Sequence, residues 1–524
     1  MSAVRNLLSR FVLMALVAIA PALAAPGDID PTLNVGLGTS GTVRAVAVDI
    51  QNRLLVVGNF TAFNGTTAGR VLRLLENGSV DPSFNAGTGA NGEIKTIEIL
   101  PDQRILVGGQ FTSFNAAAGT YGLALLDQNG AVDPGFTSGF AADGFSVGVT
   151  CLESIPGGKI MVGGYFTKYA SQTAGRYAMI TTAGALSGPS PRPAGADSHV
   201  FDIDLLANGK MLICGFFDTV DGHESACVAR LLSTGAVDTS FGTGTNLGSV
   251  AYSVEGQDDG AVIIGGSFSN YFGLGQRYLG RLTSTGLPDG SYLGNTGPNL
   301  NVYGLTLDGQ GRLIIAGQFS QFQGAAMTGI GRLASDGTRD PSFTFDRSAG
   351  PTFIQEFPID AQGRVIAYGW SNFFGRPTDV NLLRLAGGSW APQESWRFQH
   401  FGTDSATGNA AWNATPAGDG ITNLEKYALG FQGDPRTATK LWGDDGLLHG
   451  FWKDATSAGF RFRTDLTRTD ATTAAEWSDL LNDWTSAGLQ VVEESRDGTL
   501  VTWRVTLPGD HPSVFFRMKL TPGD

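Results

Sequence analysis

Histidine and cysteine are scarce in this chain. Five histidines and three cysteines occur among 524 residues, and no two histidines stand two or four residues apart, the spacing that marks many zinc sites. Asp197, Ser198 and His199 adjoin in the sequence, but a catalytic triad is defined by its geometry in space. The sequence therefore offers no readable catalytic constellation.

The odd number of cysteines leaves at least one thiol free. Cys214 and Cys227 fall on strands that are expected to be neighbours, so a disulfide between them is one possibility in an oxidising compartment. Burial as small hydrophobic residues is the other possibility, and the sequence does not decide between them.

Charged residues are also few. They make up 16% of the chain, with 48 Asp and Glu against 35 Lys and Arg, while 42% of the residues are apolar. Such a composition provides ample material for a core. The net charge of −13 argues against a nucleic-acid partner, because that binding depends on neutralising phosphates.

Long apolar runs are missing except at the N-terminus. Arg5 and Arg10 lead into the apolar run 11–20, and residues 22–24 (Ala-Leu-Ala) fit a signal-peptidase site. Residues 1–25 are therefore expected to be a signal peptide, with an uncleaved anchor as the alternative. The mature chain is expected to be exported to the periplasm, the cell surface or the medium, without a membrane span.

Glycine is abundant, with 74 residues, and much of it belongs to a repeat. One marker is a phenylalanine that closes a short apolar, glycine-containing motif and returns at steps of 51 or 55 residues: Phe60, Phe111, Phe166, Phe217, Phe268 and Phe319. A turn glycine returns at steps of 51 to 54 residues and marks seven units: Gly78, Gly130, Gly184, Gly235, Gly286, Gly337 and Gly388. Each unit holds four short candidate strands separated by turn residues, which is typical of propeller blades.

The ends of the repeat predict how the array closes. Several units end in Asp-Pro-Ser-Phe or a variant of it, as at residues 81–84 and 340–343, whereas the seventh unit stops near residue 390 without one. Residues 30–33 (Asp-Pro-Thr-Leu) supply the missing piece at the N-terminus. We therefore expect an all-β fold, with a seven-bladed β-propeller over residues 26–390 that the N-terminal strand closes. An open β-solenoid is the alternative.

The consensus of these units, DxxxRILVGGxFTxFN followed by RLxxxGxxDPSF, resembles the delta-60 repeat family of bacterial, exported β-propellers. Residues 61–65 and 112–115 extend the match. The resemblance covers about residues 28–390, and the third and seventh units depart from the pattern. It implies a fold and no known reaction, so no functional residue can be carried over.

The composition changes after Trp390. Residues 391–435 are expected to form a linker with a short helix, and residues 436–524 a small β-sandwich-like domain, because apolar and polar residues alternate there. Both parts resemble modules of secreted proteins from environmental bacteria. The linker resembles an acidic calcium loop, but only Asp419 and Asn423 remain as ligands and Lys426 stands at the twelfth position. We therefore predict no cofactor, with calcium at Asp419 and Asn423 as the alternative.

Two functional hypotheses follow. The first is a non-enzymatic scaffold for binding or adhesion, with an extracellular glycan or protein as partner. Its candidate ligand-binding residues are loop aromatics that could stack on sugar rings or simply pack between blades: Tyr165, Tyr169, Tyr271 and Phe272. The second is a propeller-type hydrolase or lyase acting on a glycan or lactone, which a carboxylate cluster in a central channel would favour.

Overall fold

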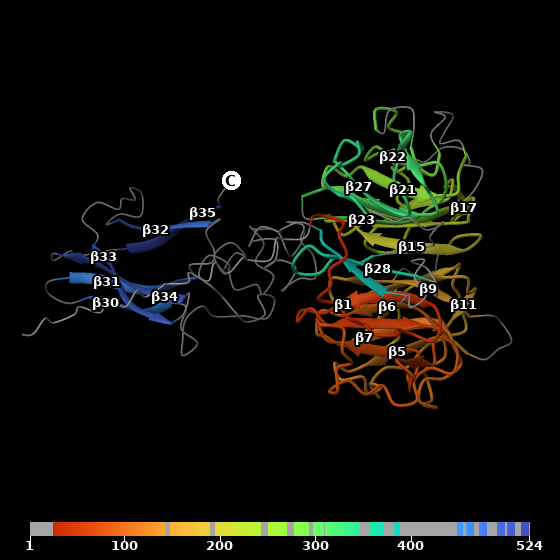
Figure 1. Ribbon diagram of the computed structural model, residues 1–524, viewed down its shortest axis with the longest axis horizontal. Helices are drawn as coiled ribbons and strands as arrows, with labels where there is room; N and C mark the ends of the chain where they lie inside the picture. Colours follow the sequence, from red (N-terminus) through yellow and green to blue (C-terminus); the bar gives the residue numbers. More distant parts are fainter. Residues whose placement is uncertain are drawn as a thin grey trace, which may run out of the picture.

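The computed structural model describes residues 25–141, 147–188, 194–242, 250–269, 277–292, 297–308, 310–345, 357–369 and 382–387, and six strands between residues 448 and 522. The described residues form strands and turns without a helix (Figure 1). None of them forms a helix long and apolar enough to cross a membrane.

Each of the first six units contains three antiparallel strands in chain order. Alternating apolar residues and short turns build these strands. The middle strands are buried over all or nearly all of their length, because sheets pack on both of their faces. The strands are β1 (Val43–Val48), β2 (Leu54–Gly58) and β5 (Val71–Leu74); β6 (Glu93–Ile99), β7 (Ile105–Gln110) and β8 (Leu123–Leu126); β9 (Val149–Ile155), β10 (Lys159–Gly164) and β13 (Tyr177–Thr181); β15 (Val200–Leu205), β16 (Met211–Gly215) and β19 (Val228–Leu231); β20 (Ala251–Gly256), β21 (Val262–Gly266) and β22 (Leu279–Leu282); β23 (Val302–Leu307), β24 (Leu313–Gly317) and β27 (Ile330–Leu333).

The seventh unit and the minor strands complete this part of the chain. The seventh unit has two described strands, β28 (Val365–Tyr368) and β29 (Leu382–Leu385). Small hairpins follow the marker phenylalanine in four units: β3 (Ala62–Phe63) with β4 (Thr66–Thr67), β11 (Lys168–Tyr169) with β12 (Gln172–Thr173), β17 (Thr219–Val220) with β18 (His223–Glu224), and β25 (Gln321–Phe322) with β26 (Ala325–Ala326).

The expected fourth strand is mostly a single bridge. Val80 pairs only with Leu74, and the chain then turns at Asp81, whose carboxylate accepts hydrogen bonds from the Ser83 backbone and hydroxyl. Proline after the aspartate has no N–H for a ladder, so the strand ends there. The third unit, which lacks the Asp-Pro motif, instead forms a two-residue fourth strand, β14 (Leu186–Ser187).

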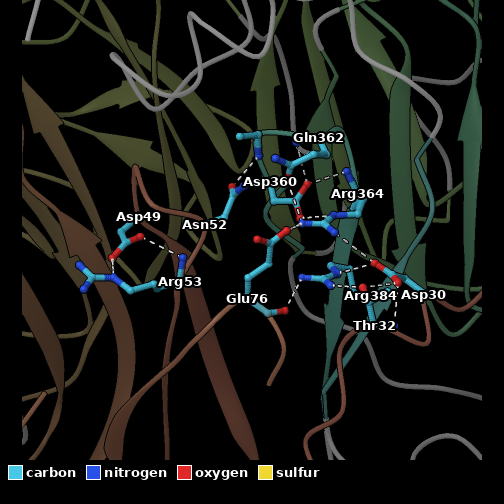
Figure 2. Close-up of polar contacts among 11 residues, drawn as sticks. Asp30, Thr32, Asp49, Asn52, Arg53, Glu76, Asp360, Gln362, Arg364 and Arg384 are labelled. Atoms are coloured by element: carbon cyan, nitrogen blue, oxygen red, sulfur yellow. Dashed lines mark hydrogen bonds and ion pairs between the residues drawn. The ribbon is translucent and has the colours of Figure 1, made fainter. Parts of the chain in front are cut away.

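The N-terminal segment pairs with the last described unit. Ile29 bridges Leu385, and the Asp30 N–H donates to the Arg384 carbonyl. Arg384 in turn donates from Nε to Asp30 at 2.7 Å and from Nη2 to the Thr32 hydroxyl at 2.7 Å, and its Nη1 reaches the Glu76 carbonyl at 2.9 Å (Figure 2). Residues 28–32 thus occupy the place that the Asp-Pro-Ser turn fills in other units.

The same arginine contacts recur inside the array. Arg73 donates to Asp81 at 2.7 Å and to the Gln128 carbonyl of the second unit, and Arg230 donates to Asp238 at 2.8 Å and to the Ser284 carbonyl of the fifth. Each of these arginines therefore links its own turn to a turn of the following unit, as Arg384 links the seventh unit to the first.

The cores lie between neighbouring sheets. One cluster joins Leu55 and Val71 of the first unit to Ile97 and Phe111 of the second. Clusters of this kind link each unit to the next along the chain, and another joins the seventh unit to the first. The sheets meet along their first strands, which lie toward the middle of the repeat region in Figure 1. We call β1, β6, β9, β15, β20 and β23 the axial strands.

The C-terminal strands form two further antiparallel groups. One sheet has the order β30 (Leu448–Lys453), β31 (Ser457–Asp465), β34 (Leu500–Pro508), β33 (Gln490–Asp497), and a second pairs β32 (Ala471–Ser478) with β35 (Phe515–Pro522). Residues 459–463 lie in β31 and residues 500–505 in β34. The calcium-loop residues Asp419 and Asn423 lie outside the described residues.

Candidate binding site at the bulges of the axial strands

Every axial strand contains one bulge at the same place. In β1 the register passes from Val43 opposite Gly58 to Ala45 opposite Val57, so the residue between them has no partner. A bulge interrupts the ladder and re-aims the side chain of the extra residue. The six bulged residues occupy one repeat position: Arg44, Lys95, Thr150, Phe201, Tyr252 and Tyr303.

A glycine opposite each bulge explains its recurrence. A Cβ on Gly109 would lie 2.2 Å from the Glu93 carbonyl oxygen, and the equivalent glycines give 2.0 to 2.2 Å. The sequence predicts a close approach of a neighbouring sheet at the glycine pair. That holds for Gly108, where a Cβ would meet Val149 of the next unit at 2.6 Å. The second glycine instead makes room for the axial strand of its own sheet, since only glycine fits there.

Aromatic rings follow one another along these bulges. The ring centroids of Phe201 and Tyr252 are 5.9 Å apart, and those of Tyr252 and Tyr303 are 5.1 Å apart. His199 lies 6.1 Å from Phe201 and 5.4 Å from Tyr165. We call these five residues the axial row. Their spacing is that of interacting aromatic pairs, so the row is one continuous apolar surface built from four units.

The first two units give the row a charged end. Lys95 Nζ lies 5.2 Å from the Tyr165 ring centroid and 3.4 Å from its hydroxyl. Arg44 Nε is 2.7 Å from Glu93, and Lys95 is 3.9 Å from the same carboxylate. Rings and cations thus meet at Tyr165, whose place is kept open by Gly148, because a Cβ there would lie 1.6 Å from the tyrosine ring.

Of the four aromatic residues predicted to bind a ligand, the two that the structure describes do not lie together in one site. Tyr165 lies in the axial row and is half-buried. Tyr169 is 1% exposed; its ring packs edge-on against Phe140 and its hydroxyl donates to the Gly184 carbonyl at 2.8 Å. It is therefore a core residue with no ring face for a ligand, which favours the packing interpretation. Tyr271 and Phe272 lie outside the described residues.

Sequence reasoning missed most of the row. It selected aromatic residues of the longer third unit and of the fifth unit as candidate ligand-binding residues. In the structure, three aromatic residues of the row occupy one repeat position, the bulge of the axial strand. Phe201, Tyr252 and Tyr303 are separated by 51 residues each, so comparing the same position across units would have found them. Phe216, which is 53% exposed, follows the glycine opposite the bulge of its unit and donates its N–H to the His199 carbonyl.

Five carboxylates lie further along the axial strands. Four stand three residues beyond the bulge in successive units, and Asp202 stands one residue beyond it; the four are Glu98, Glu153, Asp204 and Glu255. Burial raises the pKa of Glu98 and of Asp204 to about 7 and that of Asp202 to about 6. Burial and the charge of the other four carboxylates raise the pKa of Glu153 well above its usual value.

Three of these carboxylates have backbone partners. Asp202 accepts from the Val254 N–H at 3.0 Å, Asp204 from the Gly256 N–H at 2.8 Å, and Glu98 from the Ser154 N–H at 3.3 Å. Each N–H belongs to the axial strand of the next unit, which is the edge of its sheet. The carboxylates therefore cap edge N–H groups that no strand pairs with. In the part of the chain that the structure describes, no group of three His, Cys, Asp or Glu is arranged to hold a metal ion.

Two further sequence features bear on catalysis. Residues 144–148 (Gly-Phe-Ser-Val-Gly) match the G-x-S-x-G pattern of serine hydrolases. That pattern needs a strand before the serine and a helix after it, whereas Gly148 leads directly into strand β9, and Ser146 lies outside the described residues. Asp197 accepts from the Asp218 and Thr219 backbone, and His199 lies in the axial row.

The three cysteines are buried and are not joined in a disulfide. Cys214 lies in β16 opposite Val228, and Cys227 precedes that residue. Of the two possibilities left open by the sequence, the structure holds the one without a disulfide.

Repeated antiparallel sheets that meet along their first strands define a β-propeller repeat fold. Six segments match the family model described as "Domain of unknown function (DUF5122) beta-propeller": residues 52–84, 100–136, 156–178, 206–241, 257–292 and 311–343. This match supports a β-propeller repeat family, as the resemblance of the sequence implied. No curated protein matches the chain.

Three solved structures are similar to the chain at low sequence identity. YCF48 from Cyanidioschyzon merolae is 10% identical, with a TM-score of 0.40, over 67% of this chain and 97% of that one. A gluconolactonase from Xanthomonas campestris is 12% identical, with a TM-score of 0.32, over 69% and 97%. A protein studied as a candidate gluconolactonase is 12% identical, with a TM-score of 0.32, over 55% and 87%.

Proposed function

We propose that the repeats form a ring of seven blades closed by residues 28–32. The pairing of Ile29 with Leu385 and the contacts of Arg384 with Asp30 and the Glu76 carbonyl support this closure. The core shared by Ile366 of the seventh unit and Val46 of the first also supports it. In this proposal the protein is exported after removal of residues 1–25, as the N-terminal pattern predicts.

We propose that the protein is an exported, non-enzymatic binding scaffold whose ligand, a glycan, contacts the axial row. One observation carries this proposal: the bulged position differs between units while the glycine opposite it is constant. A residue that the fold requires is the same in every unit. Variation at a position that points away from the ladder is what a binding surface needs, and planar rings offer large, rigid contact area to a sugar.

The alternative is a hydrolase or lyase that acts on a glycan or lactone with the axial carboxylates. A carboxyl group whose pKa is about 7, as for Glu98 and Asp204, suits general acid–base catalysis near neutral pH. The hydrogen bonds that Asp202 and Asp204 accept from the next strand support a structural role for them instead. We therefore prefer the binding scaffold.

The test uses the mature chain, residues 26–524, and a panel of cell-wall and environmental polysaccharides. Retention on the polymer and release of soluble sugar are both scored for the unchanged protein, Tyr252→Ala and Glu153→Gln. Binding without release that falls at least tenfold in Tyr252→Ala supports the scaffold. Leu287→Ala removes an apolar side chain that is 61% exposed elsewhere and serves as the matched control. Release of sugar that Glu153→Gln abolishes would establish the alternative.

A further inference from the structure

Lys95 is a cation without a close counterion of its own. Its side chain is 24% exposed, and it lies on the rings of the axial row at Tyr165. The carboxylate that the described residues offer it is Glu93 at 3.9 Å, but Arg44 already holds Glu93 at 2.7 Å. Two cations thus share one carboxylate, whereas partly buried charges are normally paired.

The other charges on the axial strands are distributed unequally along them. Glu98, Glu153, Asp204 and Glu255 stand three residues beyond the bulges, which corresponds to roughly 10 Å along a strand. Such a distance is about one Debye length at physiological salt, so these charges act weakly on a ligand at the bulges. Asp202 is nearer, but Ser253 and the Val254 N–H bind its carboxylate. Among the groups at the bulges, Lys95 therefore acts most strongly on an anionic group, which is attracted to the Lys95 end of the row.

The row is also longer than one sugar ring. From Tyr165 to Tyr303, successive ring centroids are 5.1 to 6.1 Å apart across four contacts. A surface of this extent fits several linked rings better than a single one. Lys95 at one end of the row can bind a carboxylate, and the aromatic rings of the row can bind apolar ring faces. A ligand that carries both groups therefore fits the row.

We propose that the ligand is an acidic polysaccharide built from uronic acid units. This inference rests on the proposed binding function and names the ligand class. A uronate carboxylate pairs with Lys95 and Arg44, and neighbouring sugar rings stack on Phe201 and Tyr252.

The experiment compares homogalacturonan and alginate with their fully methyl-esterified forms, which keep the sugar rings and remove the charge. Binding to the mature chain, residues 26–524, is measured at low and at high salt. We expect the free acids to bind at least tenfold more tightly than the esters at low salt, and this preference to shrink as salt screens the charges.

Three variants separate charge from stacking. Lys95→Met keeps most of the side-chain stem, so it should abolish the preference for free acid while binding of the ester is retained. Tyr252→Ala should weaken both forms. Lys159→Met removes a lysine at the end of strand β10 away from Gly164, the glycine opposite the bulge of the third unit, and it should leave both unchanged.

The outcomes are distinguishable. Equal binding of acids and esters by the unchanged chain overturns the acidic ligand and leaves the glycan-binding scaffold standing. A preference for acids that survives in Lys95→Met overturns the assigned carboxylate site. If none of these polymers binds but a neutral glycan does, only the acidic class fails. If no glycan binds at all, the proposed function fails with it.

Discussion

Arg384 donates from Nε to Asp30 at 2.7 Å, although 354 residues separate the two in the chain. The arginine is 1% exposed, and hydrogen bonds from Thr32 and Arg384 lower the pKa of Asp30 even though burial alone would raise it. The same geometry joins Arg73 to Asp81 eight residues away. In the first unit this Arg–Asp contact joins residues close in sequence. In the seventh unit the same contact joins opposite ends of the repeat array.

Asp30→Asn should destabilise the repeat region as strongly as Asp81→Asn does. Each change leaves a buried guanidinium without its carboxylate, which costs about 3 kcal/mol, and chemical denaturation measures it. Asp102→Asn is the control, because Asp102 pairs with Arg104 at the surface and is 53% exposed, so its loss should cost below about 1 kcal/mol. An effect of Asp30→Asn no larger than that of Asp102→Asn would contradict the proposed closure.

The pairing of the N-terminal segment with the seventh unit could be predicted from the sequence, because the seventh unit lacks an Asp-Pro-Ser turn and the N-terminus has an additional Asp-Pro-Thr segment. The three main strands of each unit could be predicted because turn residues separate them in every repeat. The absence of a full fourth strand could not be predicted. The residues of that segment favour a strand, but the proline and the Asp81 side chain turn the chain after a single bridge.

The axial row was hidden for a different physical reason. A bulge is produced by the approach of a carbonyl such as that of Glu93 to a glycine on the next strand, which no local pattern records. Tyr169 shows the converse: an aromatic residue in a hairpin resembles an exposed ring, yet it is 1% exposed beneath Phe140. The glycan partner, the export and the C-terminal domain remain predictions.

Gly109→Ala should be destabilising, with a loss of about 2–3 kcal/mol, because its Cβ would lie 2.2 Å from the Glu93 carbonyl oxygen. The loss would be seen in thermal or chemical unfolding, and ligand binding should fall as well, since Glu93 precedes the Lys95 bulge. Gly242→Ala is the control, because a Cβ there meets nothing within 4 Å. Equal stability of the two variants would show that the glycine opposite the bulge is not required by sterics.

Reducing agents should leave the melting temperature unchanged, because the three buried cysteines are not joined in a disulfide. Burial raises the pKa of Cys214 well above its usual value and that of Cys227 to about 11, so neither is a thiolate at neutral pH. A thiol reagent should therefore detect almost no cysteine in the folded protein and three per chain after denaturation. Detection of one thiol after denaturation without reductant would reveal a disulfide.

The axial carboxylates should make the protein less stable as the pH rises from 5 to 8. The pKa of Asp202 is about 6 and those of Glu98 and Asp204 are about 7, all above the values near 4 that such groups have in an unfolded chain. The folded protein therefore binds more protons than the unfolded one in this range. Their contribution is complete below about pH 4 and is lost as the pH rises through 6 and 7.

Below pH 5 the paired aspartates have the opposite effect: they make the protein less stable as the pH falls. Asp238 is buried, but hydrogen bonds from Lys210, Ser240 and Arg230 hold its pKa far below the usual value, so its stabilisation is lost only in strong acid. We therefore expect a stability maximum near pH 5 and a decrease in the free energy of unfolding from there to pH 8. Unfolding free energies across a pH series measure both limbs.

Glu153→Gln should flatten the alkaline limb, because it removes the carboxyl whose pKa the other four charges raise most directly. Glu224→Gln changes an exposed glutamate in hairpin β17–β18 and should leave the pH profile as it is. A profile that stays flat from pH 5 to 8 in the unchanged protein would mean that the axial carboxylates titrate like exposed ones. A bound cation, or a larger separation between the carboxylates, would then relieve their mutual repulsion. The raised pKa values that support the catalytic alternative would no longer hold.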